Sequence, residues 1–153
     1  MAEDNWNHSV GCLVTRGEEI LLVRHTYGRA EGRLLIPGGY LNTGEMPEQA
    51  AVREVGEETG VTARVSSLLG IRFSPADWYA IFHLEYVEGT PRSDHNENSE
   101  ALFLDRQEAL RRDDLTPLSR ELLERFDRRG MTLGPFCPVY WKPEEWHLYR
   151  QGK

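Results

Sequence analysis

Three glutamates crowd the last two turns of a helix that the sequence predicts over residues 47–59. Glu54, Glu57 and Glu58 fall within an arc of about 100° on that helix. Like charges at this spacing repel one another, and the negative end of the helix dipole lies beside them. A bound cation would make the cluster favourable, and three carboxylates suit Mg²⁺ or Mn²⁺ rather than zinc. A solvated acidic face is the competing interpretation, because a run of charges usually has that meaning.

The predicted helix has sequence signals at both ends. Pro47 suits the first helical position, and Gly60 suits the left-handed residue just beyond the last turn. Met46 is a poor N-cap, so the sequence places the start of the helix less firmly than its end. Ahead of the helix, Gly38 and Gly39 would let the backbone approach a ligand closely, although most glycine pairs are merely turns.

The segment from Gly39 to Val61 matches the Nudix box, G-x5-E-x7-R-E-U-x-E-E-x-G-U with U an aliphatic residue, at every fixed position. The chain therefore resembles the Nudix hydrolase family, and the flanking predicted elements are similar in order and length from Asn7 to Phe126. The resemblance implies an α+β fold of the Nudix type, an α/β/α sandwich around a mixed β-sheet. In that fold the box forms a loop, a helix and a second loop at the edge of the sheet.

The same resemblance implies a reaction and a cofactor. The reaction is hydrolysis of a phosphoanhydride bond in a nucleoside diphosphate linked to another moiety, as in ADP-ribose, a nucleotide sugar or a nucleoside triphosphate. The cofactor is Mg²⁺ or Mn²⁺. By resemblance, Glu57 and Glu58 bind the metal, Glu54 binds the metal or assists the attacking water, and the Gly39 carbonyl is a further metal contact. The family's general base differs between members, so the sequence leaves that role open.

Two further parts of the catalytic set follow from the resemblance. Arg53 is similar to the arginine that orients the box carboxylates, and Glu45 is its expected partner. Many family members carry another acid on a loop after the central strands, and Glu97 and Glu100 both lie in that region. Glu100 is preferred because it borders the apolar segment 102–104, which would hold it more firmly. Two solvated loop acids remain the alternative.

Substrate contacts are less clearly marked. Arg24 and Arg33 flank Gly38 and Gly39, where they would bind phosphates by bidentate contacts, although solvated surface arginines fit the sequence equally well. Stacking on a base would use an aromatic residue, and at strand spacing such residues more often belong to the core. The candidates for stacking are Trp78, Tyr79 and Trp141.

A second class of function remains open at this stage. A Nudix-fold regulatory module would sense a nucleotide without cleaving it. Such modules commonly lose carboxylates of the box, and all of them are present here. The hydrolase is therefore the preferred interpretation.

Composition limits the remaining possibilities. The 153 residues fit one domain, 1–153, and carry a formal net charge of −7. Without a segregated basic face, such a chain is not expected to bind a large nucleic acid. No apolar run approaches the roughly 20 residues that cross a bilayer, and the N-terminus does not resemble a secretory signal, so we expect no membrane partner and a cytoplasmic location. Cys12 and Cys137 are expected to be core thiols.

The elements that would position the box are short strands with few helices. A last helix is expected to start after Thr116, to bury Leu118, Leu122 and Phe126, and to end at Gly130. The predicted strands are His8–Thr15, Glu19–His25, Leu34–Ile36, Ala63–Ile71, Asp77–Val87 and Ala101–Leu104, and a helical turn is predicted at Gln107–Arg111.

The C-terminal tail, from about residue 131, lies outside the resemblance but is rich in proline and aromatic residues. Aromatic side chains each bury on the order of 150–250 Å² when they pack, so we do not expect so many of them to remain exposed to water. We therefore expect the tail to fold back on the domain or onto a second subunit of a homodimer.

Overall fold

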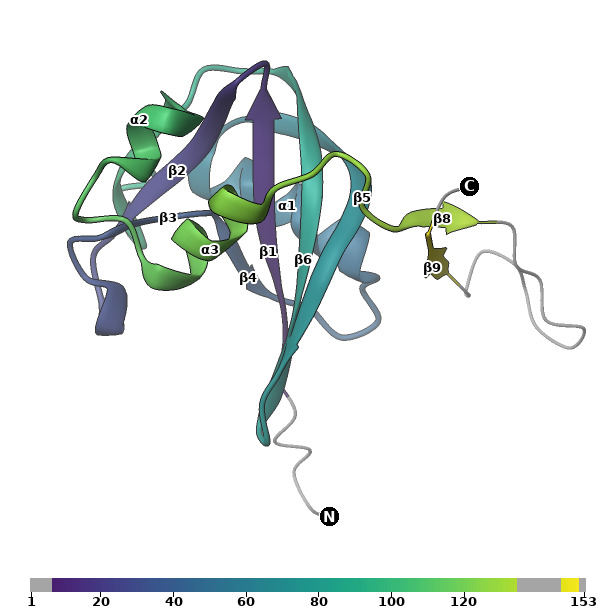
Figure 1. Ribbon diagram of the computed structural model, residues 1–153. Helices are drawn as coiled ribbons and strands as arrows, with labels where there is room; N and C mark the ends of the chain where they lie inside the picture. Colours follow the sequence, from purple (N-terminus) through teal and green to yellow (C-terminus); the bar gives the residue numbers. More distant parts are fainter. Residues whose placement is uncertain (1–6, 135–146, 152–153) are drawn as a thin grey trace, which may run out of the picture.

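A seven-stranded mixed sheet runs through the centre of the molecule (Figure 1). The computed structural model describes residues 7–134 and 147–151. The main path of the sheet is β3-β2-β1-β6-β5, while β4 pairs with β1 and β7 pairs with β2. The strands are β1 (Asn7–Arg16), β2 (Glu19–His25), β3 (Leu34–Leu35), β4 (Gly38–Tyr40), β5 (Thr62–Phe73), β6 (Asp77–Glu88) and β7 (Asn98–Asp105).

Strand β1 organises the sheet because three strands pair with it. It runs parallel to β6 along its length, whereas β2 pairs with it only at residues 15–16. Strand β4 pairs with the same strand at residues 9–11, antiparallel. Gly38 and Gly39 therefore lie within the sheet, opposite Gly11 and Val10.

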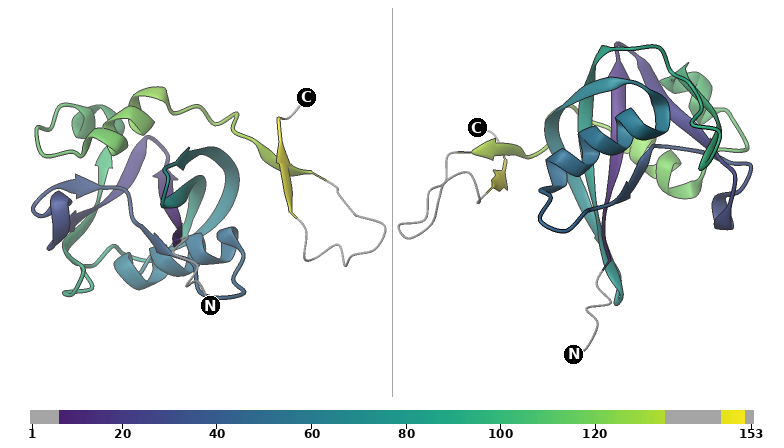
Figure 2. Two further views of the ribbon diagram at one scale, coloured as in Figure 1. Left: turned by 90° about the horizontal axis from the view of Figure 1, so that it is seen from below. Right: turned by 180° about the vertical axis from the view of Figure 1, so that it is seen from behind.

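Helices cover both faces of this sheet (Figure 2). One face carries α1 (Pro47–Thr59), and the other carries α2 (Arg106–Leu110) and α3 (Pro117–Arg125); η1 (Gly28–Ala30) is a single 3-10 turn. The expected α/β/α sandwich around a mixed sheet is confirmed. None of the described helices is long and apolar enough to span a bilayer.

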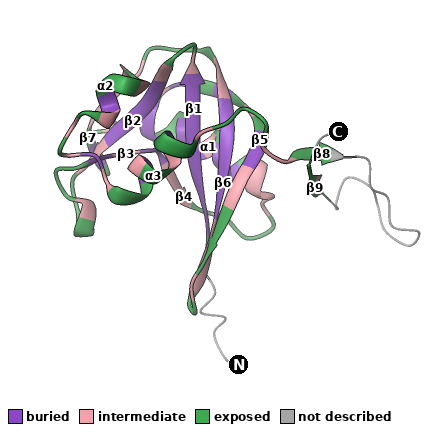
Figure 3. Cartoon of the chain, viewed as in Figure 1, coloured by how far each residue is buried: buried purple, intermediate pink, exposed green. Residues whose placement is uncertain are grey.

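Two hydrophobic cores hold the layers together. Along β1, Val10, Cys12 and Val14 belong to the core beneath α1, and Leu13 belongs to the core beneath α3, as the two-residue period of a strand requires. Figure 3 shows this burial concentrated in the central strands. Burying one such side chain contributes roughly 1.5–3 kcal/mol to folding. The prediction that Cys12 is a core thiol is confirmed, since its side chain is fully buried.

The last helix ends earlier than the sequence predicts. It stops at Arg125, and Phe126 has non-helical dihedral angles, so Gly130 does not terminate it. The Arg106 guanidinium donates hydrogen bonds to the main-chain carbonyls of residues 123–124, at 2.7 and 3.3 Å. These bonds satisfy the last carbonyl groups of the helix, which otherwise need a capping turn.

The buried face of α3 is also rotated from the predicted one. Ser119 and Leu123 are its buried residues, and Leu118 is 37% exposed. Leu122 and Phe126 are partly buried against the second core. The rotation has a polar cause: the Ser119 hydroxyl accepts a hydrogen bond from a main-chain N–H just after β3. The spacing of apolar residues alone could not predict that hydrogen bond.

The described part of the tail contacts the domain at two places. The main chain of Met131 exchanges hydrogen bonds of 2.7 and 2.9 Å with Leu68 of β5. In the two-stranded ribbon of β8 (Thr132–Gly134) and β9 (Leu148–Arg150), the Tyr149 ring packs edge-on against Phe82. These contacts join the ribbon to the core beneath α1. The prolines 135, 138 and 143 and the predicted residues Cys137, Trp141 and Trp146 lie outside the described residues.

Candidate active site

Helix α1 has the predicted bounds and places three box glutamates in its last two turns. Gly60 follows it with φ 73°, the left-handed conformation expected there. At the other end, the Met46 N–H donates to the Gln49 side chain at 3.0 Å, which supplies the cap that Met46 itself lacks. Both ends of the helix are therefore fixed by local contacts.

Arg53 is the centre of a network of carboxylates. Its Nε and Nη2 donate to Glu45 at 2.8 and 2.9 Å, so the expected contact between these residues is present. Its Nη1 contacts Glu54 at 3.0 Å and Glu57 at 3.1 Å, and its Nη2 also donates to the Tyr40 carbonyl at 3.0 Å. This network raises the pKa of Arg53 and lowers that of Glu45. One guanidinium thus orients three acids and the end of β4.

Glu54 and Glu58 are the buried members of the cluster. They are 8% and 3% exposed, whereas Glu57 is exposed. Burial is the main cause that raises both pKa values, and it raises that of Glu58 to about 9 with help from the charges of Glu54 and Glu97. The Gly38 N–H donates a hydrogen bond to Glu58, which opposes this rise. Arg53 opposes it at Glu54.

Gly39 lies directly against the Glu54 carboxylate. A Cβ atom at residue 39 would lie 2.4–2.6 Å from the carboxylate atoms of Glu54. Real side chains do not approach so closely, so any other residue here would displace Glu54. The double glycine is thus more than a turn, because it makes room for an acid of the box.

The structure separates the two candidates for the extra acid. Glu100 pairs with Arg24 across β7 and β2, with Nε–Oε2 at 2.9 Å. Glu97 lies close enough to raise the pKa values of both Glu54 and Glu58 by its charge. Of the two candidates, Glu97 is therefore the one whose charge acts on the box carboxylates, while Glu100 pairs with Arg24.

A buried asparagine that sequence analysis missed holds the Glu97 loop to α1. Asn98 is 1% exposed, and its Nδ2 donates to the Glu58 carbonyl at 2.8 Å. Its Oδ1 accepts from the Asp94 N–H at 3.2 Å, and its own N–H donates to Asp94 at 3.0 Å. The sequence offers no signal for this role, since an asparagine in a polar loop is ordinary.

The predicted phosphate-binding arginines differ in their surroundings. The Arg24 Nη1 donates to Asp114 at 2.9 Å and to the Gly32 carbonyl at 2.8 Å, and its Nε contacts Glu100. Arg33 is exposed. The guanidinium of Arg24 is thus held by protein oxygens, while Arg33 is accessible to a ligand.

Two of the aromatic residues considered for base stacking already pack against other residues of the protein. The Trp78 ring stacks on His8 with centroids 4.4 Å apart. The Tyr79 hydroxyl fills the space beside Gly11, where a Cβ atom would lie 2.0 Å from it. Trp141 lies outside the described residues.

The carboxylates fit a hard divalent cation, although they are not gathered as a finished ligand set. Among residues 7–134 and 147–151, no three His, Cys, Asp or Glu side chains converge closely enough to hold a metal. Arg53 binds Glu57, which explains part of this separation. Glu58 has no cationic partner in the described part of the chain, and burial penalises its charge. Buried carboxylate oxygens in need of positive charge suit Mg²⁺ or Mn²⁺.

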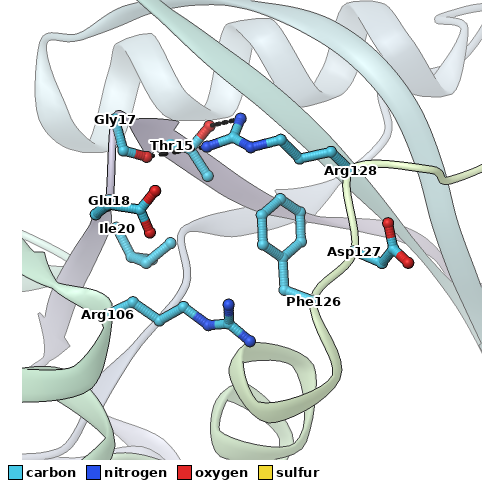
Figure 4. A pocket seen from close by; sticks show the side chains of 8 residues that line it. All are labelled: Thr15, Gly17, Glu18, Ile20, Arg106, Phe126, Asp127 and Arg128. Atoms are coloured by element: carbon cyan, nitrogen blue, oxygen red, sulfur yellow. Dashed lines mark hydrogen bonds between the residues drawn. The ribbon is translucent and has the colours of Figure 1, made fainter.

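A separate cavity of about 340 Å³ lies on the other side of the sheet. Figure 4 shows the Phe126 ring there between Arg106 and Arg128. Arg128 donates to the Gly17 carbonyl at 3.0 Å, and Arg106 donates to the end of α3. These arginines anchor the segment that leaves α3, and no carboxylate of the box lines the cavity.

A model of the NUDIX domain matches residues 6–126 of the chain. The chain belongs to the Nudix family. The assignment made from the box is therefore confirmed, and the match covers all seven strands of the main sheet of this Nudix domain.

Relatives of this Nudix domain differ in what they act on. An ADP-ribose pyrophosphatase of Methanocaldococcus jannaschii is 39% identical over 67 residues, 44% of this chain and 40% of that protein. Diphosphoinositol polyphosphate phosphohydrolase 3-alpha of Mus musculus is 39% identical over 71 residues, 44% of this chain and 42% of that protein. The match thus spans less than half the length of either relative.

Among solved structures, a crystal structure of a Nudix hydrolase from Nitrosomonas europaea matches the fold with a TM-score of 0.71. It is 21% identical, and the match covers 78% of this chain and 68% of that one. At this identity the likeness establishes the shared fold.

Proposed function

We propose that this Nudix domain is a Mg²⁺- or Mn²⁺-dependent hydrolase that cleaves a phosphoanhydride bond in a nucleoside diphosphate linked to another moiety. The observation that carries the proposal is the burial of Glu54 and Glu58 beside the glycine pair. Arg53 orients Glu54, whereas no cationic side chain among the described residues pairs with Glu58. Burying two carboxylates in this way lowers the free energy of unfolding, so the arrangement indicates a functional site.

Four groups of this chain would hold the metal: the carboxylates of Glu54, Glu57 and Glu58 and the carbonyl of Gly39. We add Glu97 to this acidic group in place of Glu100. When bound, the metal would neutralise phosphate charge and lower the pKa of a water molecule. Phosphoryl transfer depends mainly on such positioning and electrostatic stabilisation.

The chain's own residues contribute orientation. Arg53 holds Glu45 and Glu54 through hydrogen bonds, and the Gly38 N–H holds Glu58. Arg33 is exposed and available for a phosphate of the substrate. A cytoplasmic location and a homodimer remain predictions.

A nucleotide-sensing module without hydrolysis is the second candidate. The retention of every carboxylate of the box argues against it, as does the close fit of Gly39 to Glu54. A sensor needs affinity for its ligand, whereas an acidic cluster beside the ligand's phosphates repels them unless a metal intervenes.

The test is hydrolysis of a panel containing ADP-ribose, nucleotide sugars and nucleoside triphosphates, with products identified by mass. With Mg²⁺ or Mn²⁺ present, we expect cleavage of at least one compound and none with EDTA. Glu54→Gln should fold normally and lose about 10²–10³-fold in kcat, because the amide keeps the shape but not the charge. The matched control is Glu124→Gln, an exposed glutamate on α3. Full activity of Glu54→Gln would remove Glu54 from the mechanism, and metal-dependent binding without cleavage would favour the sensor.

A further inference from the structure

Two exposed aromatic side chains border the acidic cluster of Glu54, Glu58 and Glu97. Among the described residues, three aromatic side chains are strongly exposed: Tyr27 at 53%, Tyr40 at 63% and Phe73 at 71%. Phe73 is at the end of β5, in the hairpin that projects from the sheet (Figure 1). The other two border the box, as the contacts of their neighbours show.

Tyr27 follows β2 and is tied to the Glu97 loop. The N–H of the preceding residue, Thr26, donates to the Glu97 carbonyl at 3.1 Å, and its hydroxyl donates to the Asn96 carbonyl at 2.8 Å. One face of the Tyr27 ring stacks on His25, with centroids 5.1 Å apart and planes inclined by 16°. Burial lowers the pKa of His25, although the charges of Glu97 and Asp94 oppose this, so the protein favours the neutral imidazole in this stack.

Tyr40, the last residue of β4, also lies beside the acidic cluster. Its carbonyl accepts from Arg53 at 3.0 Å, and its neighbour Gly39 abuts the Glu54 carboxylate. Burial, and after it the charges of Glu97, Glu58, Tyr40 and Glu54, raise the pKa of the Tyr27 hydroxyl, which is consistent with a position of both phenols beside the box carboxylates. Each ring is pinned through its own main chain or a stacked neighbour, and each remains open to solvent.

We propose that Tyr27 and Tyr40 are substrate-specificity residues that stack on the base of a nucleoside diphosphate derivative while its phosphates lie over the carboxylates. This inference rests on the proposed function and assigns the residues that would bind the base of its substrate. Exposed aromatic rings beside a site that would bind phosphates provide flat surfaces on which any nucleobase can stack.

The charged groups around the box disfavour a polyphosphorylated inositol, the kind of compound named for one relative. Such a ligand has no aromatic ring and needs many free cations. Here Arg24 is bound to Asp114 and Glu100, and Arg53 is bound to glutamates of the box. The chain also carries a formal net charge of −7.

The experiment compares equilibrium binding of ADP and of inorganic pyrophosphate, both with Mg²⁺, by calorimetry. Stacking of one base on an aromatic ring changes affinity by about 5- to 150-fold. Tyr27→Ala and Tyr40→Ala should weaken ADP binding by an amount in this range and change pyrophosphate binding by less than about twofold. Tyr27→Phe should keep the affinity for ADP, because the ring suffices. Phe73→Ala is the matched control, since it removes an exposed aromatic ring far from the box.

Each outcome decides the proposal. Unchanged ADP affinity in both alanine variants, equal weakening for ADP and pyrophosphate, or a wild-type protein that does not bind ADP would each overturn it. Base-dependent binding in a protein that hydrolyses nothing would uphold the stacking role and reject the proposed hydrolysis, so the two failures can be told apart.

Discussion

At the scale of single residues, the site depends on how closely Glu54 fits between Arg53 and Gly39. The guanidinium contacts the carboxylate at 3.0 Å from one side, and the glycine lies against it on the other. The side chain is also 8% exposed, so it has little freedom to move into another position. Catalytic groups lose activity when they are misplaced by as little as about 1 Å.

Gly39→Ala tests this fit. The new methyl group would lie 2.4–2.6 Å from the carboxylate atoms of Glu54, so Glu54 must move. We expect a folded protein whose kcat falls at least about 10²-fold, in line with other losses of a positioned group. The control is Gly70→Ala, because a Cβ atom there meets nothing within 4 Å. Circular dichroism and the hydrolysis rate measure the two effects, and equal rates for both variants would contradict the argument.

Residue types and spacing predicted much of this site, since the box residues lie on one short helix and its preceding loop. Such reasoning could not predict contacts between side chains on neighbouring strands. Arg24 meets Glu100 because the register of β2 against β7 places them opposite each other, next to an irregularity at residues 24–25. A shift of one residue would have turned Glu100 to the other face. Neither the register nor the irregularity is marked in the sequence.

At the scale of elements, the link between α1 and the loop before β7 sets the position of Glu97. Asn98 makes this link by bonding the Glu58 carbonyl and the Asp94 N–H from a fully buried position. We therefore expect Asn98 to be a positioning residue, which acts on the carboxylates through the loop.

Asn98→Ala should therefore loosen the loop and affect metal binding. We expect an approximately 10-fold loss of Mn²⁺ affinity, the usual size for a residue that supports metal ligands. Unsatisfied buried groups should also lower the free energy of unfolding by about 1–3 kcal/mol. Titration of free Mn²⁺ by electron paramagnetic resonance measures the first and urea denaturation the second. Asn96→Ala, an exposed position in the same loop, is the control. Destabilisation with unchanged Mn²⁺ affinity would reduce Asn98 to a purely structural role.

Element boundaries were predictable where the chain carries its own signals. Pro47 and Gly60 define α1 as expected, and β2 has the predicted bounds. The expected strand Ala101–Leu104 extends in β7 from Asn98 to Asp105, because pairing with β2 continues beyond the apolar residues. The end of α3 was missed for a similar reason, since its cap comes from the distant Arg106.

At the scale of the whole molecule, binding at the box is coupled to folding. Helix α1 packs on one core, and its last turns carry buried acids whose charge opposes folding. A cation that binds only the folded protein stabilises it by RT ln(1 + [L]/Kd). The stability of the folded protein therefore reports metal binding at the box, and this measurement needs no substrate.

The most direct measurement is the thermal midpoint of unfolding with EDTA and with rising Mg²⁺ or Mn²⁺. At about 100 times its Kd, the ion should stabilise the protein by about 2.7 kcal/mol and raise the midpoint by roughly 5–10 °C. Glu57→Gln should blunt this rise, because it removes an exposed ligand without disturbing the core, while Glu124→Gln should leave it intact. A wild-type midpoint that neither metal changes, or a full rise in Glu57→Gln, would contradict the account of the carboxylates as the metal site of this Nudix domain.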